Sequence, residues 1–172
     1  MSVIERPFLD YSVKKLEQYS SRIQDCLGRL TDDQVWVRSS TNENAVGNLV
    51  LHLCGNVRQW IGSGIAGLPN IRERDSEFAT RGGVLNVELA DRLNAVVRDA
   101  TAIIAGLPDS RLTETTTVQG YDVTVLEAVY HVVEHFSHHA GQIVFATKLI
   151  TSGDLGYYKH LAGDAAHSEK TP

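Results

Sequence analysis

Apolar residues recur at three- and four-residue steps through four long segments of the chain, and this spacing is typical of amphipathic helices. The segments run from Phe8 to Leu30, from Ala45 to Ala66, from Val87 to Ala105, and from Val123 or Thr124 to Ile150. Four such helices, with one long connection between the second and the third, predict an all-α four-helix bundle.

Polar and β-branched residues mark the connections between these helices. Asn44 and Asn86 are candidate N-terminal caps for the second and third helices. β-Branched residues on both sides of Gln119-Gly120 predict a short β-hairpin before the last helix. The charged segment from Ile71 to Gly83 has no helical or strand period, and we expect an ordered loop there.

The second predicted helix is rich in glycine. Each glycine weakens an exposed helix interior by roughly 1 kcal/mol relative to alanine. Helices tolerate such positions where a neighbouring backbone or a ligand must come close. The sequence therefore predicts close approaches along this helix, at positions among Gly47, Gly55, Gly62 and Gly64.

The composition favours one folded domain and excludes several kinds of partner. The 172 residues, 42% of them hydrophobic, suffice for one core, expected over residues 1–162 with a disordered tail at 163–172. A net charge of −5 leaves no basic face for nucleic acid. No apolar stretch is long enough for a membrane span, and the first residues lack the pattern of a signal peptide, so we expect a cytoplasmic protein. Cys26 and Cys54 form no spacing pattern that predicts a disulfide.

Histidines gather on one side of the last predicted helix. His135 and His139 are four residues apart, which is about 40° around the helix axis and one turn along it. Two neutral imidazoles in that arrangement can bind one divalent metal ion. The pair alone is a weak signal, because histidines that serve the core can share this spacing. The same stripe carries further polar candidates for a pocket: His131, His138 and Gln142.

A third histidine strengthens the metal interpretation. His52 lies in an apolar run of the second predicted helix, as a core-facing residue would. Taken alone, it is more simply explained as a buried neutral histidine bonded to a carbonyl. Cys54 points roughly 200° away from it, so partner ligands must come from another helix. With His135 and His139, His52 would complete a three-nitrogen site that leaves a coordination position for water or substrate.

The sequence contains three motif-like runs, at Asn44–Trp60, Arg72–Phe78 and His135–Ile143. Together and in this order, they resemble the DinB-like superfamily, and more narrowly its branch of uncharacterised small bacterial proteins. The resemblance covers the chain from Leu16 to Ile150. It implies a four-helix bundle of the DinB/YfiT-like metalloenzyme type, usually a homodimer.

The resemblance also implies a functional site. The family holds a divalent metal with three histidines, and these ligands fall on His52, His135 and His139 of this sequence. His131 and His138 match no fixed ligand position of the family and are candidates for the surroundings of the metal. Zinc or nickel is the expected ion, with iron or manganese as alternatives, because histidine sets alone do not separate these metals.

Characterised members of the wider superfamily suggest an activity. They include thiol-dependent transferases and isomerases that use bacillithiol or mycothiol. The implied function is metal-dependent transfer of a low-molecular-weight thiol to a small electrophile, with no catalytic residue assigned. Gln142 would orient metal-bound solvent or a ligand, and Arg58 would meet a substrate carboxylate. Their simpler roles are an interhelix hydrogen bond for Gln142 and a surface or interface charge for Arg58.

Other classes of function stay open on the sequence alone. A non-catalytic metal-binding protein, or a stress-related interaction protein, would also fit a bundle that carries histidines. A zincin protease is disfavoured, because Phe136 stands where the HExxH pattern needs its glutamate. The inverted pattern at His131–His135 would leave His52 and His139 unexplained.

The run Arg72–Phe78 has two interpretations. Its alternating charges would pair with one another on a solvated loop. Alternatively, Arg72, Arg74, Asp75 and Glu77 anchor the loop against the bundle or a second copy of the chain, and the aromatic side chain at the end of the run is buried.

Overall fold

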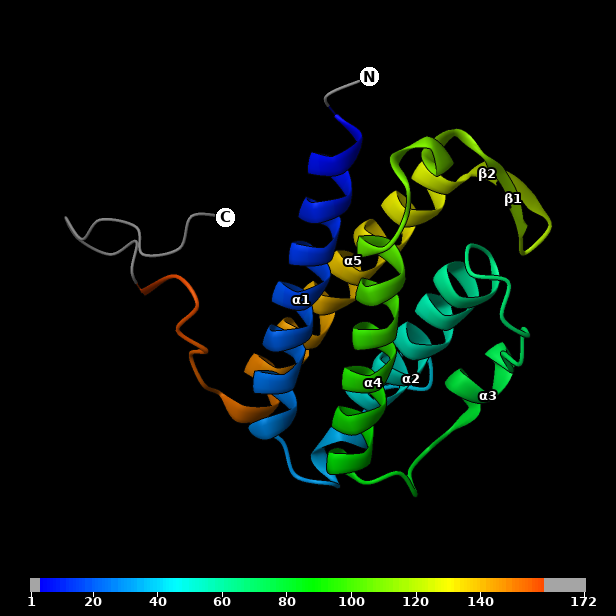
Figure 1. The fold of residues 1–172 in the computed structure, drawn as a ribbon. Helices are drawn as coiled ribbons and strands as arrows, with labels where there is room; N and C mark the ends of the chain where they lie inside the picture. The colour runs from blue at the N-terminus through cyan, green and yellow to red at the C-terminus, as the bar shows by residue number, and fades with distance from the viewer. Residues whose placement is uncertain (1–3, 160–172) are drawn as a thin grey trace.

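Four long helices form a bundle in the computed structural model, which describes residues 4–159. They are α1 (Glu5–Gly28), α2 (Val46–Val57), α4 (Asn86–Ala105) and α5 (Val125–Thr151). α1 packs against α4 and α5, and α2 packs against the same two helices (Figure 1). The predicted all-α four-helix bundle is confirmed.

The core lies between these helices and consists of the apolar stripes that the sequence pattern predicts. Removing apolar surface from water stabilises the fold by roughly 25 cal/mol per Å². All four helices contribute large, fully buried side chains: Leu9, Leu16, Ile23, Leu27, Leu53, Leu89, Leu93, Ile104, Phe136 and Ile143. Between residues 4 and 159, no helix combines the length and the apolarity that crossing a membrane would need.

A short antiparallel hairpin leads into α5. Its strands are β1 (Thr115–Val118) and β2 (Tyr121–Thr124), and they follow the short 3₁₀ helix η3 (Asp109–Thr113). The turn residues Gln119 and Gly120 both have positive φ, 55° and 80°, as a two-residue type I′ turn requires. The predicted hairpin is confirmed.

A capping box fixes where α5 begins. The Thr124 hydroxyl accepts the Glu127 backbone N–H at 3.2 Å, and the Glu127 carboxylate accepts the Thr124 backbone N–H at 2.7 Å. The box satisfies donors that the first turn of a helix otherwise leaves open. It holds the first turn of α5 at the end of the hairpin, and so helps to fix how the later turns of the helix face α2.

The second predicted helix has the expected extent, but its hydrogen-bonding pattern changes from α-helical to π-helical near the end. α2 ends at Val57, and the chain continues as a π-helical segment, η2 (Arg58–Ser63). The residue at the cap position is Ala45 rather than Asn44, and the Asn48 side chain accepts the Ala45 N–H at 3.1 Å. Widened turns of this kind are frequent at functional sites.

The third predicted helix also begins differently from the expectation. Asn86 is the first residue of α4 rather than its cap, and Leu85 occupies the cap position. The Asn86 amide instead donates to the carbonyl oxygens of Leu27 and Leu30, at 2.5 and 2.7 Å. It therefore joins the start of α4 to Leu27, near the end of α1, and to Leu30, which precedes the 3₁₀ helix η1 (Gln34–Trp36).

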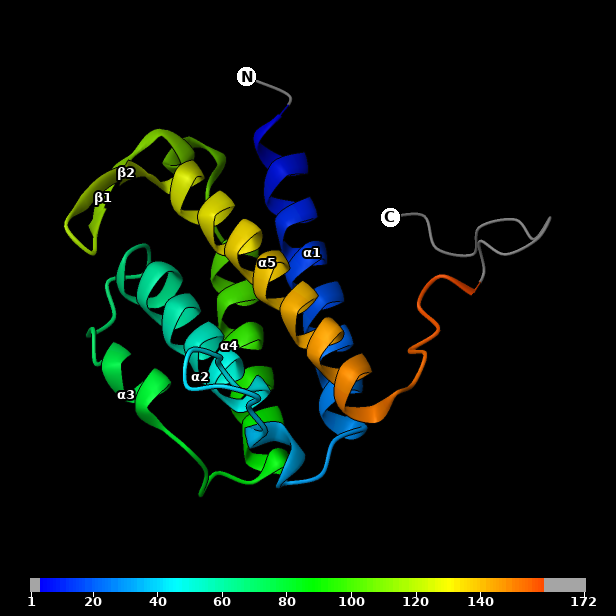
Figure 2. The ribbon, with the colours of Figure 1, turned by 180° about the vertical axis from the view of Figure 1, so that it is seen from behind.

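The segment expected to be a loop contains a short helix. α3 (Arg74–Ala79) lies on the outer side of α2, away from α1 (Figure 2). The Asn48 amide, from α2, donates to the carbonyl oxygens of Glu77 and Thr80, both at 2.9 Å. A helix this short shows no sequence period, and contacts with α2 hold it in place. The loop prediction is wrong for these residues.

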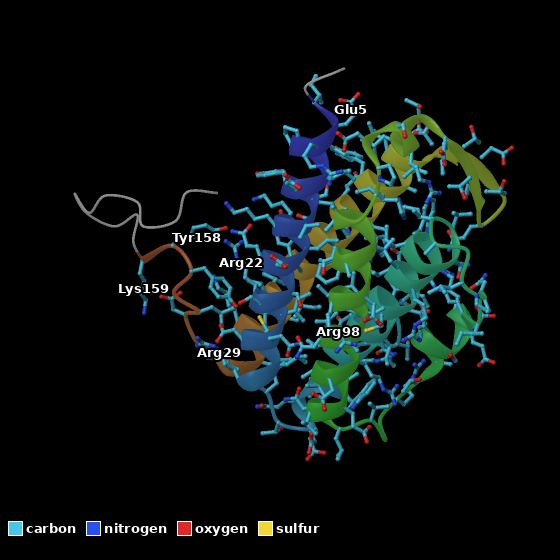
Figure 3. All side chains as sticks on the ribbon, in the orientation of Figure 1. Glu5, Arg22, Arg29, Arg98, Tyr158 and Lys159 are labelled. Carbon is cyan, nitrogen blue, oxygen red and sulfur yellow. The ribbon has the colours of Figure 1, made fainter. Side chains whose placement is uncertain are left out.

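The last described residues pack back on α1. Leu155 is buried, and the Tyr157 hydroxyl lies 3.0 Å from the Arg22 carbonyl oxygen and 2.9 Å from the Asp25 carboxylate. Tyr158 lies beside Arg22, with its hydroxyl 3.4 Å from the guanidinium (Figure 3). The tail predicted to be disordered, residues 163–172, lies outside the described residues.

Replacing Phe136 by alanine should cost the fold much more than replacing Phe145 on the same helix. Phe136 is fully buried, whereas Phe145 is 65% exposed. We expect the free energy of unfolding to fall by about 3–5 kcal/mol for Phe136→Ala. For Phe145→Ala the expected change is within about 0.5 kcal/mol. Chemical denaturation followed by circular dichroism measures both changes, and equal losses would contradict this assignment of the core.

Candidate metal centre

Three histidine side chains converge between α2 and α5. The Nε2 atom of His135 lies 3.0 Å from Nε2 of His52 and 3.1 Å from Nε2 of His139. One nitrogen from each of the three residues lies within 4.8 Å of the others, an arrangement that could hold a metal ion. His52 is buried, and the other two are half-buried. The structure therefore brings together the three residues that the sequence predicts as ligands.

Helix geometry explains how the three side chains meet. His135 and His139 are one turn apart on α5 and project from the same side. Leu49 and Leu53 flank His52 on α2 and are buried in the core, so His52 on the same side of the helix faces inward. Contacts between α2 and α5 then place the ring of His52 opposite the pair.

A carboxylate fixes the orientation of His52. Its Nδ1 atom lies 2.9 Å from Oε2 of Glu77, which comes from α3 and can only accept a hydrogen bond. Nη2 of Arg72 is 3.1 Å from the same Nδ1. The proton nevertheless belongs on Nδ1, because a bare nitrogen there would face the Glu77 carboxylate. The lone pair of His52 is therefore on Nε2 and points at the other histidines.

The same argument applies to His139. Its Nδ1 atom lies 2.7 Å from the side-chain oxygen of Gln142, so Nδ1 carries the proton and Nε2 carries the lone pair. Two lone pairs, from His52 and His139, thus face Nε2 of His135. A single proton on His135 could satisfy only one of them, whereas one metal ion would accept all three nitrogens. The donor set therefore fits a divalent cation.

Two of the three imidazoles, those of His135 and His139, are in the neutral form that binds metals. Burial, together with the nearby His139 and His52, lowers the pKa of His135 to about 3. Burial also lowers the pKa of His139, against a smaller opposing effect of its hydrogen bond with Gln142. His135 and His139 are accordingly neutral near pH 7, and a metal ion would not have to displace a proton from either Nε2.

Glu77 is held ionised by Arg72. Burial on its own would raise the pKa of this carboxyl group, but hydrogen bonds from Arg72 and His52 outweigh burial and lower it. Arg72 donates from Nε to Oε1 at 2.7 Å and from Nη2 to Oε2 at 2.9 Å, which makes a bidentate pair. Nη1 of Arg72 donates to Gln59 at 2.9 Å. The side chain of Arg72 is only 4% exposed.

This arrangement decides between the two interpretations of the run Arg72–Phe78. Arg72 and Glu77 anchor the segment to α2, while Arg74 and Asp75 are exposed. Phe78 is half-buried, and the centre of its ring is 4.7 Å from that of His52. The segment is thus anchored to the bundle through part of its charges and its aromatic residue.

A glycine makes room for the carboxylate. A Cβ atom at Gly55 would overlap Oε1 of Glu77 and approach Nε of Arg72 to 2.9 Å. Any side chain at this position would displace the Arg72–Glu77 pair from α2. Gly55 is therefore one of the close approaches that the glycines of this helix predict.

The remaining candidates lie around the three ligands. His131 stacks on Trp60 at 4.0 Å between ring centres and is 5.5 Å from the ring of His135. His138 is exposed and lies edge-on to His139 at 5.2 Å. Neither belongs to the converging group. Of the three converging histidines, Gln142 forms a hydrogen bond only with His139.

Two residues of α2 and η2 are placed away from the metal centre. Cys54 is buried on another side of the helix, as its angular position predicts, and burial raises its pKa to about 12. Arg58 is exposed and lines a cavity whose wall contains none of the three ligand histidines. The expectation that Arg58 meets a carboxylate at the metal site is therefore not supported by its position.

Sequence reasoning missed the role of Glu77 as the partner of His52. The two residues are 25 positions apart, and Glu77 lies on a helix too short to show a period. The available signal was chemical: a buried histidine that binds a metal needs an acceptor for its other nitrogen. The carboxylates of the run Arg72–Phe78 were the candidates for this acceptor.

The comparison with known families assigns the chain. The sequence profile of a family described as "Protein of unknown function (DUF1572)" matches residues 3–162. The chain belongs to this family. None of the curated proteins matches the sequence significantly. The crystal structure of a conserved protein from Enterococcus faecalis is similar, with a TM-score of 0.71 and 16% identity over 89% of this chain and 99% of that one. At this identity the likeness shows a shared fold.

Replacing Glu77 by glutamine should weaken metal binding. The variant keeps the size of the side chain but removes the charge that polarises His52, and we expect a loss of about 10–100-fold in affinity. Glu73→Gln is the control, because Glu73 is an exposed carboxylate of the same segment. Competition with a chelator measures the dissociation constants, and circular dichroism confirms that both variants are folded. Equal affinities for Glu77→Gln and the unaltered chain would contradict the role assigned to Glu77.

Proposed function

We propose that the protein is a divalent-metal-dependent enzyme that acts on a small molecule. The observation that carries the proposal is the convergence of the Nε2 atoms of His52, His135 and His139, two of which have their lone pairs fixed by Glu77 and Gln142. Three protein ligands leave at least one coordination position open, which is the arrangement of catalytic rather than structural sites. Zinc or nickel is the expected ion, with iron or manganese as alternatives.

The reaction that we propose is transfer of a low-molecular-weight thiol to a small electrophile. When bound, the metal would favour the thiolate form of a coordinated thiol. The sulfur would form a bond to the electrophilic carbon, and the leaving group would depart with its electron pair. The chain's own part is to hold the ligands: Glu77 fixes His52, Gln142 fixes His139, and burial keeps His135 neutral.

The resemblance to the DinB-like superfamily supports this proposal. The three runs that carry the resemblance contain all three histidines of the site, and one of them supplies Arg72 and Glu77. A homodimer and a cytoplasmic location stay predictions from the sequence.

Metal content is the first test of the site. Protein purified without a histidine tag should contain roughly one divalent ion per chain. His52→Ala and the double variant His135→Ala/His139→Ala should both lose it, whereas His138→Ala should retain it, because His138 is exposed and outside the converging group. Elemental analysis gives the content. An unaltered chain that binds no zinc or nickel, even when either is added, would overturn the proposal.

Thiol binding tests the reaction class. In cobalt-substituted protein, a small thiol such as cysteine should produce a sulfur-to-metal charge-transfer band, because the coordinated thiol loses its proton. Serine, which lacks the sulfur, is the matched control ligand, and the His135→Ala/His139→Ala variant is the matched control protein. If cysteine gives no band while cobalt is bound, the thiol-transfer reaction is wrong, and a metal-binding protein without this chemistry remains.

A further inference from the structure

A cavity of about 330 Å³ lies between α2, α3 and α4. None of the three ligand histidines lines it, and the buried Arg72–Glu77 pair forms part of its wall. Volumes near 300 Å³ are at the lower end of those that bind small ligands. The cavity is thus separate from the metal centre, although the two share one pair of residues.

Two arginines give the wall of this cavity an excess of positive charge. Arg58 and Arg92 both line it, and neither forms a hydrogen bond or an ion pair with any residue between 4 and 159. Arg72 and Glu77 neutralise each other there, which leaves Glu73 as the other carboxylate of the wall. The excess of positive charge stands out in a chain whose net charge is −5.

The thiol in the wall adds no negative charge. Cys54 is buried, and burial raises its pKa to about 12 even though Arg58 and Arg92 act in the opposite direction. An anion that enters would therefore meet two guanidinium groups and a neutral thiol.

An apolar cavity adjoins the charged one. It has a volume of about 340 Å³, and Arg58 and Ile71 belong to the walls of both cavities. Its one carboxylate, Asp99, is paired with Arg98 at 3.0 Å. The rest of its wall is mainly apolar, from Val57, Leu68, Pro69, Val96, Ala100 and Ile103.

We propose that these two cavities together bind a small carboxylate with an apolar chain. The carboxylate would lie against Arg58 and Arg92, and the apolar chain would extend past Ile71 into the second cavity. Charge complementarity selects an anion in the first cavity, and the apolar wall selects a hydrocarbon in the second. The proposal does not depend on the metal centre, because no ligand histidine touches either cavity.

Titration of the full-length protein with hexanoate tests the proposal. Chemical shifts of backbone amides report both the affinity and the place of binding, and residues of both cavities should respond. Hexanamide has the same chain without the charge, and acetate has the charge without the chain. We expect each to bind about tenfold more weakly than hexanoate, because each lacks one of the two contributions.

An arginine variant locates the charge contact. Arg92→Gln should weaken hexanoate binding about tenfold. Lys14→Gln is the control, since Lys14 is an exposed cation of α1 that lies outside the walls of both cavities. Both side chains are exposed, so neither variant should disturb the fold. The proposal is overturned if hexanoate does not saturate, if hexanamide binds equally well, or if Lys14→Gln weakens binding as much as Arg92→Gln does.

Discussion

The buried hydrogen-bonded chain from Arg72 through Glu77 to His52 is the interaction on which the candidate site depends. An ionised carboxylate is costly to bury unless its charge is paired and its oxygens are hydrogen-bonded. Here both conditions hold, because Arg72 binds both oxygens and His52 donates to one of them. One face of α2 is adapted to this chain of bonds. The Asn48 side chain donates to the backbone of α3. His52, one turn later on α2, bonds the Glu77 carboxylate, and Gly55 leaves the space that this carboxylate occupies.

This arrangement explains why a short helix without sequence period lies over a bundle that is otherwise regular. α3 has little intrinsic stability, because a helix of this length is marginal in water without tertiary contacts. Its position comes from the hydrogen bonds to Asn48 and from the buried Arg72–Glu77 pair, which bonds to His52 of α2 and to Gln59 of η2. The segment in turn supplies Phe78, whose ring lies beside His52. The segment between α2 and α4 therefore supplies both the carboxylate and the aromatic ring that surround His52.

Periodicity made the bundle predictable, and helix geometry made the three histidines predictable. The apolar stripe of α5 fixes which way Phe136 and Ile143 turn, and His135 and His139 follow from the same helix. Glu77 and the helix that carries it could not be found in this way, because their positions depend on pairing between residues far apart in the sequence. The caps failed for a related reason. The Asn86 side chain bonds to the carbonyl oxygens of Leu27 and Leu30 instead of capping its own helix, and these contacts between distant residues depend on tertiary structure.

Arg72 stands between the metal centre and the charged cavity, and its bonding determines what it can do for each. Nε and Nη2 are committed to Glu77, and Nη1 is committed to Gln59, so few donors remain for a ligand in the cavity. Glu77 balances its charge, so Arg72 adds no net charge to the cavity wall and stays a fixed part of the support for His52. An anion that stayed with Arg58 and Arg92 would leave that support intact. An anion that drew Arg72 away would leave Glu77 buried without its main partner, and by linkage the metal and the anion would then weaken each other's binding by the same factor. The bidentate Arg72–Glu77 pair opposes this displacement of Arg72, because two charge-assisted bonds would have to be broken to release it.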